Sequence, residues 1–445
     1  MRWLQVARRQ VGVVILAGAA VVATGVGTQL VLQPTVARGG CSGVDSGYGY
    51  NASGTNGSTG YGYDDGCVPT GTYIPVTPTR ILDGRSSPMV NLGVNGTFDL
   101  KVTGVAGVPE TGVSAVVLNL TVDRPTAASY FTLSPAGVPT ATSSLNFAAG
   151  ETRAADTTVK VGAGGKVTIF NAFGSAFPIV DVQGYFADTV SPRTGSSYVP
   201  LTTPSRVLDT RVGGAATKFG AGTTRDVPLT PAVPAGATAV VANFTVTNPT
   251  TFGFLTVYPA GTPTRPVVSN LNWAPGRSIP NLATIPLGTD GKISVFNSEG
   301  ASDVLIDVAG YYVPRESAVV GDRFTPVAPQ RLGDSRSNIG GLTTFTTANQ
   351  TKNLKVTGVG GVPATNVSAV VVSITSDNVE ADTFFTAFPK GGAAVPNVSN
   401  LNPIAGENAA NLAIVRVGTG GEITLLNRTP KANIIVDVYG YFTGA

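Results

Sequence analysis

The chain has 445 residues, a formal net charge of +3, only 12% charged residues and no histidine. The missing histidine excludes Ser-His-Asp and Cys-His catalysis, histidine-ligated zinc and the usual general base near neutral pH. The basic residues are scattered rather than clustered, which gives no reason to expect nucleic acid as a partner. Glycine (56) and proline (31) are abundant, a composition typical of many short strands and turns.

Residues 1–37 have the pattern of an export signal or a membrane anchor. Three arginines precede an almost uninterrupted apolar run over residues 11–32. A charged region followed by an apolar region is typical of export signals, and residues 35–37 (Thr-Val-Ala) offer small side chains to a signal peptidase. Because the apolar run is also long enough to span a bilayer, membrane anchoring by residues 11–32 is the alternative to cleavage.

Residues 38–72 are rich in Gly, Ser, Asn and Tyr and show no apolar period, which predicts a flexible tether. Cys41 and Cys67 lie in this segment, and the chain has no other cysteines. Two cysteines in an exported chain predict a disulfide that closes this loop. Free thiols or an intermolecular bond are the alternatives.

One segment then occurs three times, with a period of about 125 residues. Each copy opens with an Arg-x-(Leu or Gly)-Asp-x-Arg motif and closes with Asp-Val-x-Gly-Tyr. The copies span residues 73–186, 198–313 and 324–445, and are called repeats 1, 2 and 3. The period is too long for a solenoid and fits a tandem array of one domain, each large enough for its own core. The short connectors permit domains arranged as beads on a string, but not wide separation between them.

The apolar period within each repeat is two, which is typical of β-strands. Residues 113–122, with counterparts at 237–246 and 367–376, alternate as half-buried strands do. Further strands of repeat 1 are expected around residues 130–134, 142–147, 157–161, 166–171 and 179–186. Roughly eight or nine short strands per repeat, without a helical stretch, predict three tandem antiparallel β-sandwiches of Greek-key or jelly-roll type.

The two motifs bring charged residues into each repeat. They are Arg80, Asp83 and Asp181 in repeat 1, Arg206, Asp209 and Asp307 in repeat 2, and Arg331, Asp334 and Asp437 in repeat 3. The last acid of each set lies in mid-strand between apolar residues, where burial is costly unless the acid is paired. We predict that the arginine of the opening motif binds this acid and clamps the first strand of each repeat to the last.

Calcium binding or catalysis by paired carboxylates are the alternatives for these acids. The Asp-x-Asp-x-Asp-Gly spacing of a calcium loop is absent. Moreover, an active site is usually built once, whereas these residues recur in three adjacent repeats. We therefore expect a structural role, no catalytic residues, no metal and no cofactor.

A second recurring element is Leu-Asn followed by an apolar residue. Its copies contain Asn146 and Phe147, Asn272 and Trp273, and Asn402 and Pro403. Asparagine at a strand end usually satisfies the backbone of a turn, and an apolar cover at the sandwich edge is the simpler interpretation of the indole. The alternative is a shallow carbohydrate site, in which Trp273 stacks on a sugar and the three asparagines bind its hydroxyls.

The chain resembles a tandem-repeat β domain of exported actinobacterial proteins. The matching segments are Tyr198-Val-Pro-Leu, Arg206-Val-Leu-Asp-Thr-Arg211, Pro234-Ala-Gly-Ala-Thr-Ala-Val-Val and Asp307-Val-Ala-Gly-Tyr311. The resemblance covers residues 73–443, is best in repeat 2 and weakens in repeat 3, where Gly333 replaces a leucine. It implies accessory modules of secreted and cell-surface proteins, with no agreed catalytic residues.

We therefore expect a non-enzymatic protein that is secreted or associated with the cell envelope, acting in adhesion or as a structural envelope component. The alternative is a multivalent carbohydrate-binding array that recognises cell-wall or environmental polysaccharide. The expected partner is an envelope polymer, a polysaccharide or a surface protein. Three linked copies favour both functions, because tethered weak sites gain avidity.

Overall fold

The computed structural model describes residues 71–188, 195–213, 217–288, 290–315, 317–392 and 394–444. The predicted export signal and the predicted Cys41–Cys67 disulfide lie outside these residues. The described secondary structure consists of β-strands with short 3-10 turns such as Ala163–Gly165, so the all-β prediction is confirmed. No helix within the described residues is long and apolar enough to cross a membrane.

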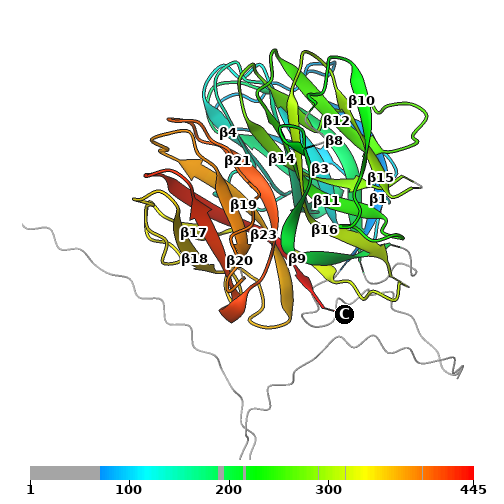
Figure 1. Cartoon of the computed structure of the whole chain (residues 1–445). Helices are drawn as coiled ribbons and strands as arrows, with labels where there is room; N and C mark the ends of the chain where they lie inside the picture. The colour runs from blue at the N-terminus through cyan, green and yellow to red at the C-terminus, as the bar shows by residue number, and fades with distance from the viewer. Residues whose placement is uncertain are drawn as a thin grey trace, which may run out of the picture. The chain divides into compact units, whose positions relative to one another are not determined.

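Repeat 1 folds into two antiparallel sheets (Figure 1). The inner sheet has the order β1 (Thr72–Asp83), β8 (Phe177–Ala187), β3 (Val113–Asp123) and β6 (Arg153–Lys160). The outer sheet has the order β2 (Gly96–Lys101), β7 (Lys166–Asn171), β4 (Ser129–Pro135) and β5 (Leu145–Phe147). Successive strands alternate between the two sheets, except that β4 and β5 are neighbours in the outer sheet, and this order is that of a jelly roll.

Repeat 2 contains the same arrangement, and repeat 3 contains it with three strands in its outer sheet, since Leu401 forms only an isolated bridge with Phe385. The inner sheet of repeat 2 is β14 (Ile279–Pro286), β11 (Ala239–Thr247), β16 (Asp303–Pro314) and β9 (Ser196–Asp209), and its outer sheet is β10 (Thr223–Pro228), β15 (Lys292–Asn297), β12 (Gly253–Pro259) and β13 (Leu271–Trp273). The inner sheet of repeat 3 is β17 (Arg323–Asp334), β23 (Asn433–Thr443), β19 (Val367–Asp377) and β21 (Ala410–Arg416), and its outer sheet is β18 (Gln350–Lys355), β22 (Glu422–Asn427) and β20 (Phe385–Pro389).

Each sandwich has its own apolar core, but the inner sheet is also buried on its other face. In β3, Val116 and Leu118 pack into the core of repeat 1. The alternate residues Ala115 and Val117 belong to a different cluster, which contains residues of all three repeats. The prediction of a half-buried strand over residues 113–122 is therefore wrong, because nearly every side chain of β3 is buried. A near-continuous apolar sequence is what a strand covered on both faces requires.

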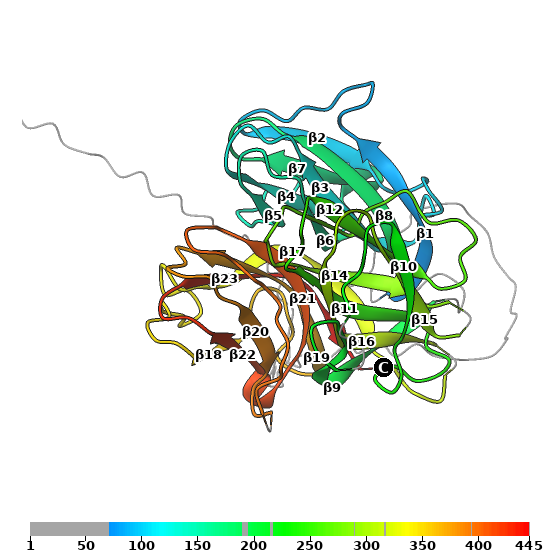
Figure 2. The same cartoon turned by 45° about the horizontal axis from the view of Figure 1, so that its top comes forward.

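The three repeats close around this shared cluster. Its aromatic members are Tyr73 and Phe186 of repeat 1, Tyr198 and Tyr312 of repeat 2, and Phe324, Tyr439 and Phe442 of repeat 3. Their rings are in contact across the repeat boundaries, and the centroids of Phe186 and Phe324 lie 4.4 Å apart. Figure 2 shows the strands of repeat 1 at the top, those of repeat 2 at the lower right and those of repeat 3 at the lower left.

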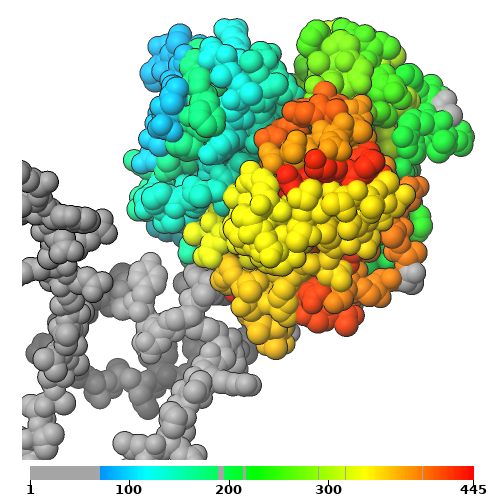
Figure 3. All heavy atoms as spheres, turned by 90° about the vertical axis from the view of Figure 1, so that its left-hand side faces the viewer, coloured from blue at the N-terminus to red at the C-terminus, as the bar shows by residue number. Residues whose placement is uncertain are grey.

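Backbone pairing at the start of each repeat completes the closure. Tyr73 pairs with Ser196, Tyr198 pairs with Asp322, and Gly71 pairs with Phe324. Each repeat is thus bridged to both others, and the inner sheets of repeats 1 and 2 merge into one eight-stranded sheet. The described strands belong to one compact unit, whose three repeats meet at the surface in Figure 3. Of the arrangements that the short connectors permit, the structure has the repeats packed on one another, since side chains on the inner sheets are buried against neighbouring repeats.

Candidate functional site

The structure brings the predicted arginine and aspartate of each repeat together. The distance from the arginine Nε to the aspartate Oδ1 is 2.8 Å for Arg80 and Asp181, 2.7 Å for Arg206 and Asp307, and 2.9 Å for Arg331 and Asp437. A second bond from Nη2 to Oδ2 makes each pair bidentate. Because the two residues lie on the first and last strands, each pair ties the ends of one repeat together.

The same arginines also contact the aspartate of the opening motif. Arg80 Nη1 lies 3.4 Å from Asp83 Oδ2, and Arg85 binds Asp83 through Nε and Nη2 at 2.8 and 2.7 Å. These bonds from Arg85 lower the pKa of Asp83 to about 2. Burial instead raises the pKa of Asp181, and the bonds from Arg80 oppose this rise. The acids of both motifs are therefore held in arginine contacts, which leaves their oxygens poorly placed to act on a substrate.

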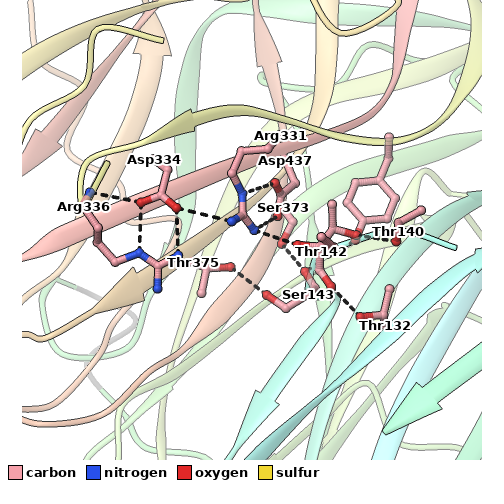
Figure 4. A network of polar contacts seen from close by, with 12 residues as sticks. Thr132, Thr140, Thr142, Ser143, Arg331, Asp334, Arg336, Ser373, Thr375 and Asp437 are labelled. Carbon is pink, nitrogen blue, oxygen red and sulfur yellow. Dashed lines mark hydrogen bonds and ion pairs between the residues drawn. The ribbon is translucent and has the colours of Figure 1, made fainter. Parts of the chain in front are cut away.

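The arginine of repeat 3 also reaches the neighbouring repeat (Figure 4). Arg331 Nη2 donates to the carbonyl oxygen of Ala141 in repeat 1 at 3.1 Å. Beside it, Ser373 Oγ donates to the carbonyl oxygen of Ser143 at 3.2 Å, and Ser143 Oγ lies 3.2 Å from Thr375 Oγ1. This network connects the inner sheet of repeat 3 to the segment before β5 of repeat 1.

Equivalent contacts join the other repeats. Asn119 Nδ2 donates to the carbonyl oxygen of Ser269 at 2.6 Å, and Asn243 Nδ2 donates to that of Ser399 at 2.7 Å. The first bond runs from repeat 1 to repeat 2, the second from repeat 2 to repeat 3, and the bond from Ser373 returns to repeat 1. The three contacts form a closed cycle, so each boundary between repeats is fixed by a directional hydrogen bond.

A charged cluster from all three repeats was not foreseen from the sequence. Glu407 of repeat 3 accepts a hydrogen bond from Arg153 of repeat 1 at 2.8 Å and another from Arg277 of repeat 2. Arg153 is only 2% exposed, and Glu151 is a further partner at 3.5 Å. Glu151 and Glu407 share one position of the repeat, but Arg277 replaces them in repeat 2, and Arg153 is replaced by Ile279 and Ala409 in the other repeats. The repeat pattern therefore carried no signal for a contact between these residues.

The four residues predicted as ligand-binding have different surroundings. Trp273 is only 4% exposed and packs in the core of repeat 2, where its Nε1 donates to the carbonyl oxygen of Thr251 at 3.1 Å. The indole is covered, as the simpler interpretation expects, so the alternative in which it stacks on a sugar does not hold. Asn272 Oδ1 accepts from Ser269 Oγ at 3.1 Å. By contrast, the buried Oδ1 atoms of Asn146 and Asn402 accept no hydrogen bond within the described part of the chain.

These two asparagines line separate hollows at the repeat boundaries. Asn146 lines a groove of about 530 Å³ between repeats 1 and 3. Asn402 lines a smaller cavity of about 160 Å³ between repeats 2 and 3, together with Arg206 and Arg211. Both arginines of the smaller cavity are already bound to aspartates of repeat 2. The larger groove is therefore the better candidate for a ligand.

Comparisons with known proteins do not assign this chain to a family. No protein-family model matches it, and no curated protein matches it. Two solved structures are similar over 85% of this chain and 91% of theirs, at 11% identity. One is described as the triple jelly roll fold and turret assembly in an archaeal virus, with a TM-score of 0.17, and the other as the atomic structure of Sulfolobus Turreted Icosahedral Virus, with a TM-score of 0.16. TM-scores this low support no conclusion about this chain. Within the described residues, no group of three or more His, Cys, Asp or Glu side chains is placed to hold a metal ion.

Proposed function

We propose that this chain is a non-enzymatic exported protein that acts at the cell surface or in its surroundings, in adhesion or as a structural component of the envelope. The strongest support comes from the contacts of the repeated acids. Asp181, Asp307 and Asp437 are each bound bidentately by an arginine of the same repeat. A role in holding strands together explains why the same charges recur three times. The apolar N-terminal run over residues 11–32 supports export.

The experiment is to locate the full chain in its own cells. Intact cells are labelled with a membrane-impermeant biotin reagent, and the protein is then followed by antibody in the medium, envelope and cytosolic fractions. Labelled protein in the envelope or medium supports the proposal. Unlabelled protein confined to the cytosol contradicts it.

Carbohydrate binding is the second candidate function, and one observation favours it. The groove that contains Asn146 combines aromatic and polar side chains, the composition of many sugar sites. The buried Trp273 argues against three equivalent sites, so a single groove is a better hypothesis than the multivalent array. An envelope polymer or polysaccharide is then the partner.

A further inference from the structure

The groove between repeats 1 and 3 has the size of a ligand site. Its volume of about 530 Å³ lies within the range of roughly 300–1,000 Å³ that is usual for small-molecule pockets. Repeat 1 forms one wall with residues 128–130, 146–148 and 173, and repeat 3 forms the other with residues 404–408. Arg277 of repeat 2 also lines it. The groove therefore exists only when the three repeats are closed on one another.

Asn146 supplies an unused acceptor in this groove. The residue is 8% exposed, and its buried Oδ1 has no hydrogen-bond partner within the described residues. In repeat 2, the counterpart Asn272 is satisfied by Ser269 Oγ. In repeat 1 the equivalent hydroxyl, Ser143 Oγ, is instead turned to Thr375 of repeat 3. Leaving a buried amide oxygen unpaired is unfavourable, and a hydrogen bond from a hydroxyl group of a ligand would remove this cost.

Aromatic side chains beside Asn146 are left open in repeat 1. Half-buried Tyr130 and 58% exposed Phe173 both line the groove, and their rings lie 6.5 Å apart in an edge-to-face arrangement. In repeat 2, the counterpart of Tyr130 is Phe254, whose ring lies beside that of Phe296. Arg265 covers the Phe296 ring, with its Cζ 3.7 Å from the ring centroid.

In repeat 3, the counterpart of Tyr130 is Phe384. Arg428 covers this ring, with its Cζ 5.2 Å from the centroid. Arginine thus covers the counterpart of Tyr130 in repeat 3 and the counterpart of Phe170 in repeat 2. Within the described residues, no cation lies over the ring of Tyr130 or Phe173 of repeat 1.

The groove also contains a donor without a partner. Arg277 Nε is buried and makes no hydrogen bond within the described residues, although Nη2 of the same guanidinium binds Glu407. One wall therefore offers an acceptor at Asn146, the boundary with repeat 2 offers a donor at Arg277, and aromatic faces lie beside them. A molecule that presents hydroxyl groups at its edges and C–H groups on its face would complement all three.

We infer that the groove binds a saccharide, with Asn146 Oδ1 accepting from a sugar hydroxyl and Tyr130 and Phe173 contacting the face of a ring. This inference rests on the second candidate function and gives it a single location. It assigns the site to repeat 1, closed by repeat 3, and not to the predicted tryptophan of repeat 2.

The test is calorimetric titration of the full chain with cellohexaose, chitohexaose and mannohexaose. We expect saturable binding of at least one of them, weakened about tenfold in Phe173→Ala and in Asn146→Leu, the loss expected from removing one good contact. Because Asn146 has no partner for its Oδ1, the leucine variant should be as stable to urea as the parent chain or more stable. Loss of binding would then not be caused by unfolding.

Two matched variants serve as controls. Phe252→Ala removes another exposed phenylalanine, in the turn between β11 and β12 of repeat 2, and should leave binding unchanged. Asn272→Leu removes an asparagine that accepts a bond from Ser269, so it should lower stability without lowering affinity. The inference is overturned if none of the three sugars binds, or if binding survives both groove variants. Neither result would alter a surface location found by biotin labelling, so the two proposals fail separately.

Discussion

Asp156 of β6 shows how one residue can limit the stability of the closed unit. Its backbone N–H donates to Asn281 Oδ1 at 2.8 Å, but its buried Oδ1 has no hydrogen-bond partner within the described residues. The counterparts in repeats 2 and 3 are the apolar residues Leu282 and Leu412, which pack in the shared cluster. Asp156→Asn keeps the shape of the side chain but removes its buried ionisable group, and should therefore stabilise the protein.

The gain from Asp156→Asn should grow with pH. Burial holds the pKa of Asp156 well above its ordinary value, whereas in the unfolded chain it is about 3.9. The folded state therefore binds more protons, and this stabilising contribution is lost as the pH rises above 3.9, by about 1.4 kcal/mol per pH unit up to the folded pKa. Urea unfolding of both proteins at about pH 5 and about pH 7 measures the difference. An equal gain at both values would contradict this assignment, and Leu282→Asp, which places an acid at the equivalent position of repeat 2, should create a similar pH-dependent loss.

The two arginines of an opening motif should differ in their contribution to stability. Arg206 binds Asp307, which is only 2% exposed, whereas Arg211 binds Asp209 at the surface and is itself exposed. Arg206→Ala would leave a buried carboxylate unpaired and should lower the free energy of unfolding by about 3 kcal/mol. Arg211→Ala should cost less than about 1 kcal/mol. Urea denaturation compares the two variants, and equal losses would show that burial of the Arg206–Asp307 pair does not set the contribution of the motif to stability.

At the scale of the element, the first and last strands of each repeat approach each other closely. This contact lies between the opening segment and the glycine of the closing motif. A Cβ atom on Gly184 of β8 would lie 2.6 Å from Tyr73 Oη of β1. Gly310 meets Tyr198 and Gly440 meets Phe324 in the same way. The glycine of the closing motif thus leaves the room that the aromatic ring of the opening segment fills.

Gly184→Ala should therefore force this ring out of the shared cluster. Overpacking of this kind costs about 1–3 kcal/mol. The control is Gly93→Ala, because a Cβ atom at Gly93 would meet nothing within 4 Å. Thermal unfolding of the two variants gives the comparison, and a Gly184→Ala protein as stable as Gly93→Ala would disprove the close fit.

The sequence located most strands of repeat 1 because their period of two is strong. The strand over residues 166–171 has the predicted bounds, and β3 differs from its prediction by one residue. The predicted strand over residues 142–147 shrinks to Leu145–Phe147, because Ser143 and its neighbours bond to repeat 3 instead of continuing a ladder. Such contacts involve residues that are far apart in the chain, and no local period encodes them.

The candidate site was predictable only in part. The arginine and aspartate pairs follow from the cost of burying an acid, and Asn146 follows from its recurring position. Phe173 and Arg277 gave no signal, since neither recurs in the other repeats. The groove depends on where repeats 1 and 3 meet, which is a property of the closed unit and not of any single repeat.

For the whole molecule, the shared aromatic cluster should make unfolding of the three repeats one event. An isolated repeat would expose its share of that cluster, such as Tyr198 and Tyr312 of repeat 2, which are fully buried in the closed unit. Exposing large aromatic side chains removes about 1.5–3 kcal/mol of burial for each.

We therefore expect differential scanning calorimetry of the full chain to show a single transition, with equal calorimetric and van't Hoff enthalpies. Tyr312→Ala, a change within repeat 2, should move this whole transition to lower temperature by removing ring contacts with Tyr73 and Phe186 of repeat 1. Independent domains would instead give separate transitions, and the substitution would shift only that of repeat 2. A single shift of the whole transition would mean that the ring contacts hold the three repeats together. Because the groove walls come from different repeats, those contacts would then also hold the groove together.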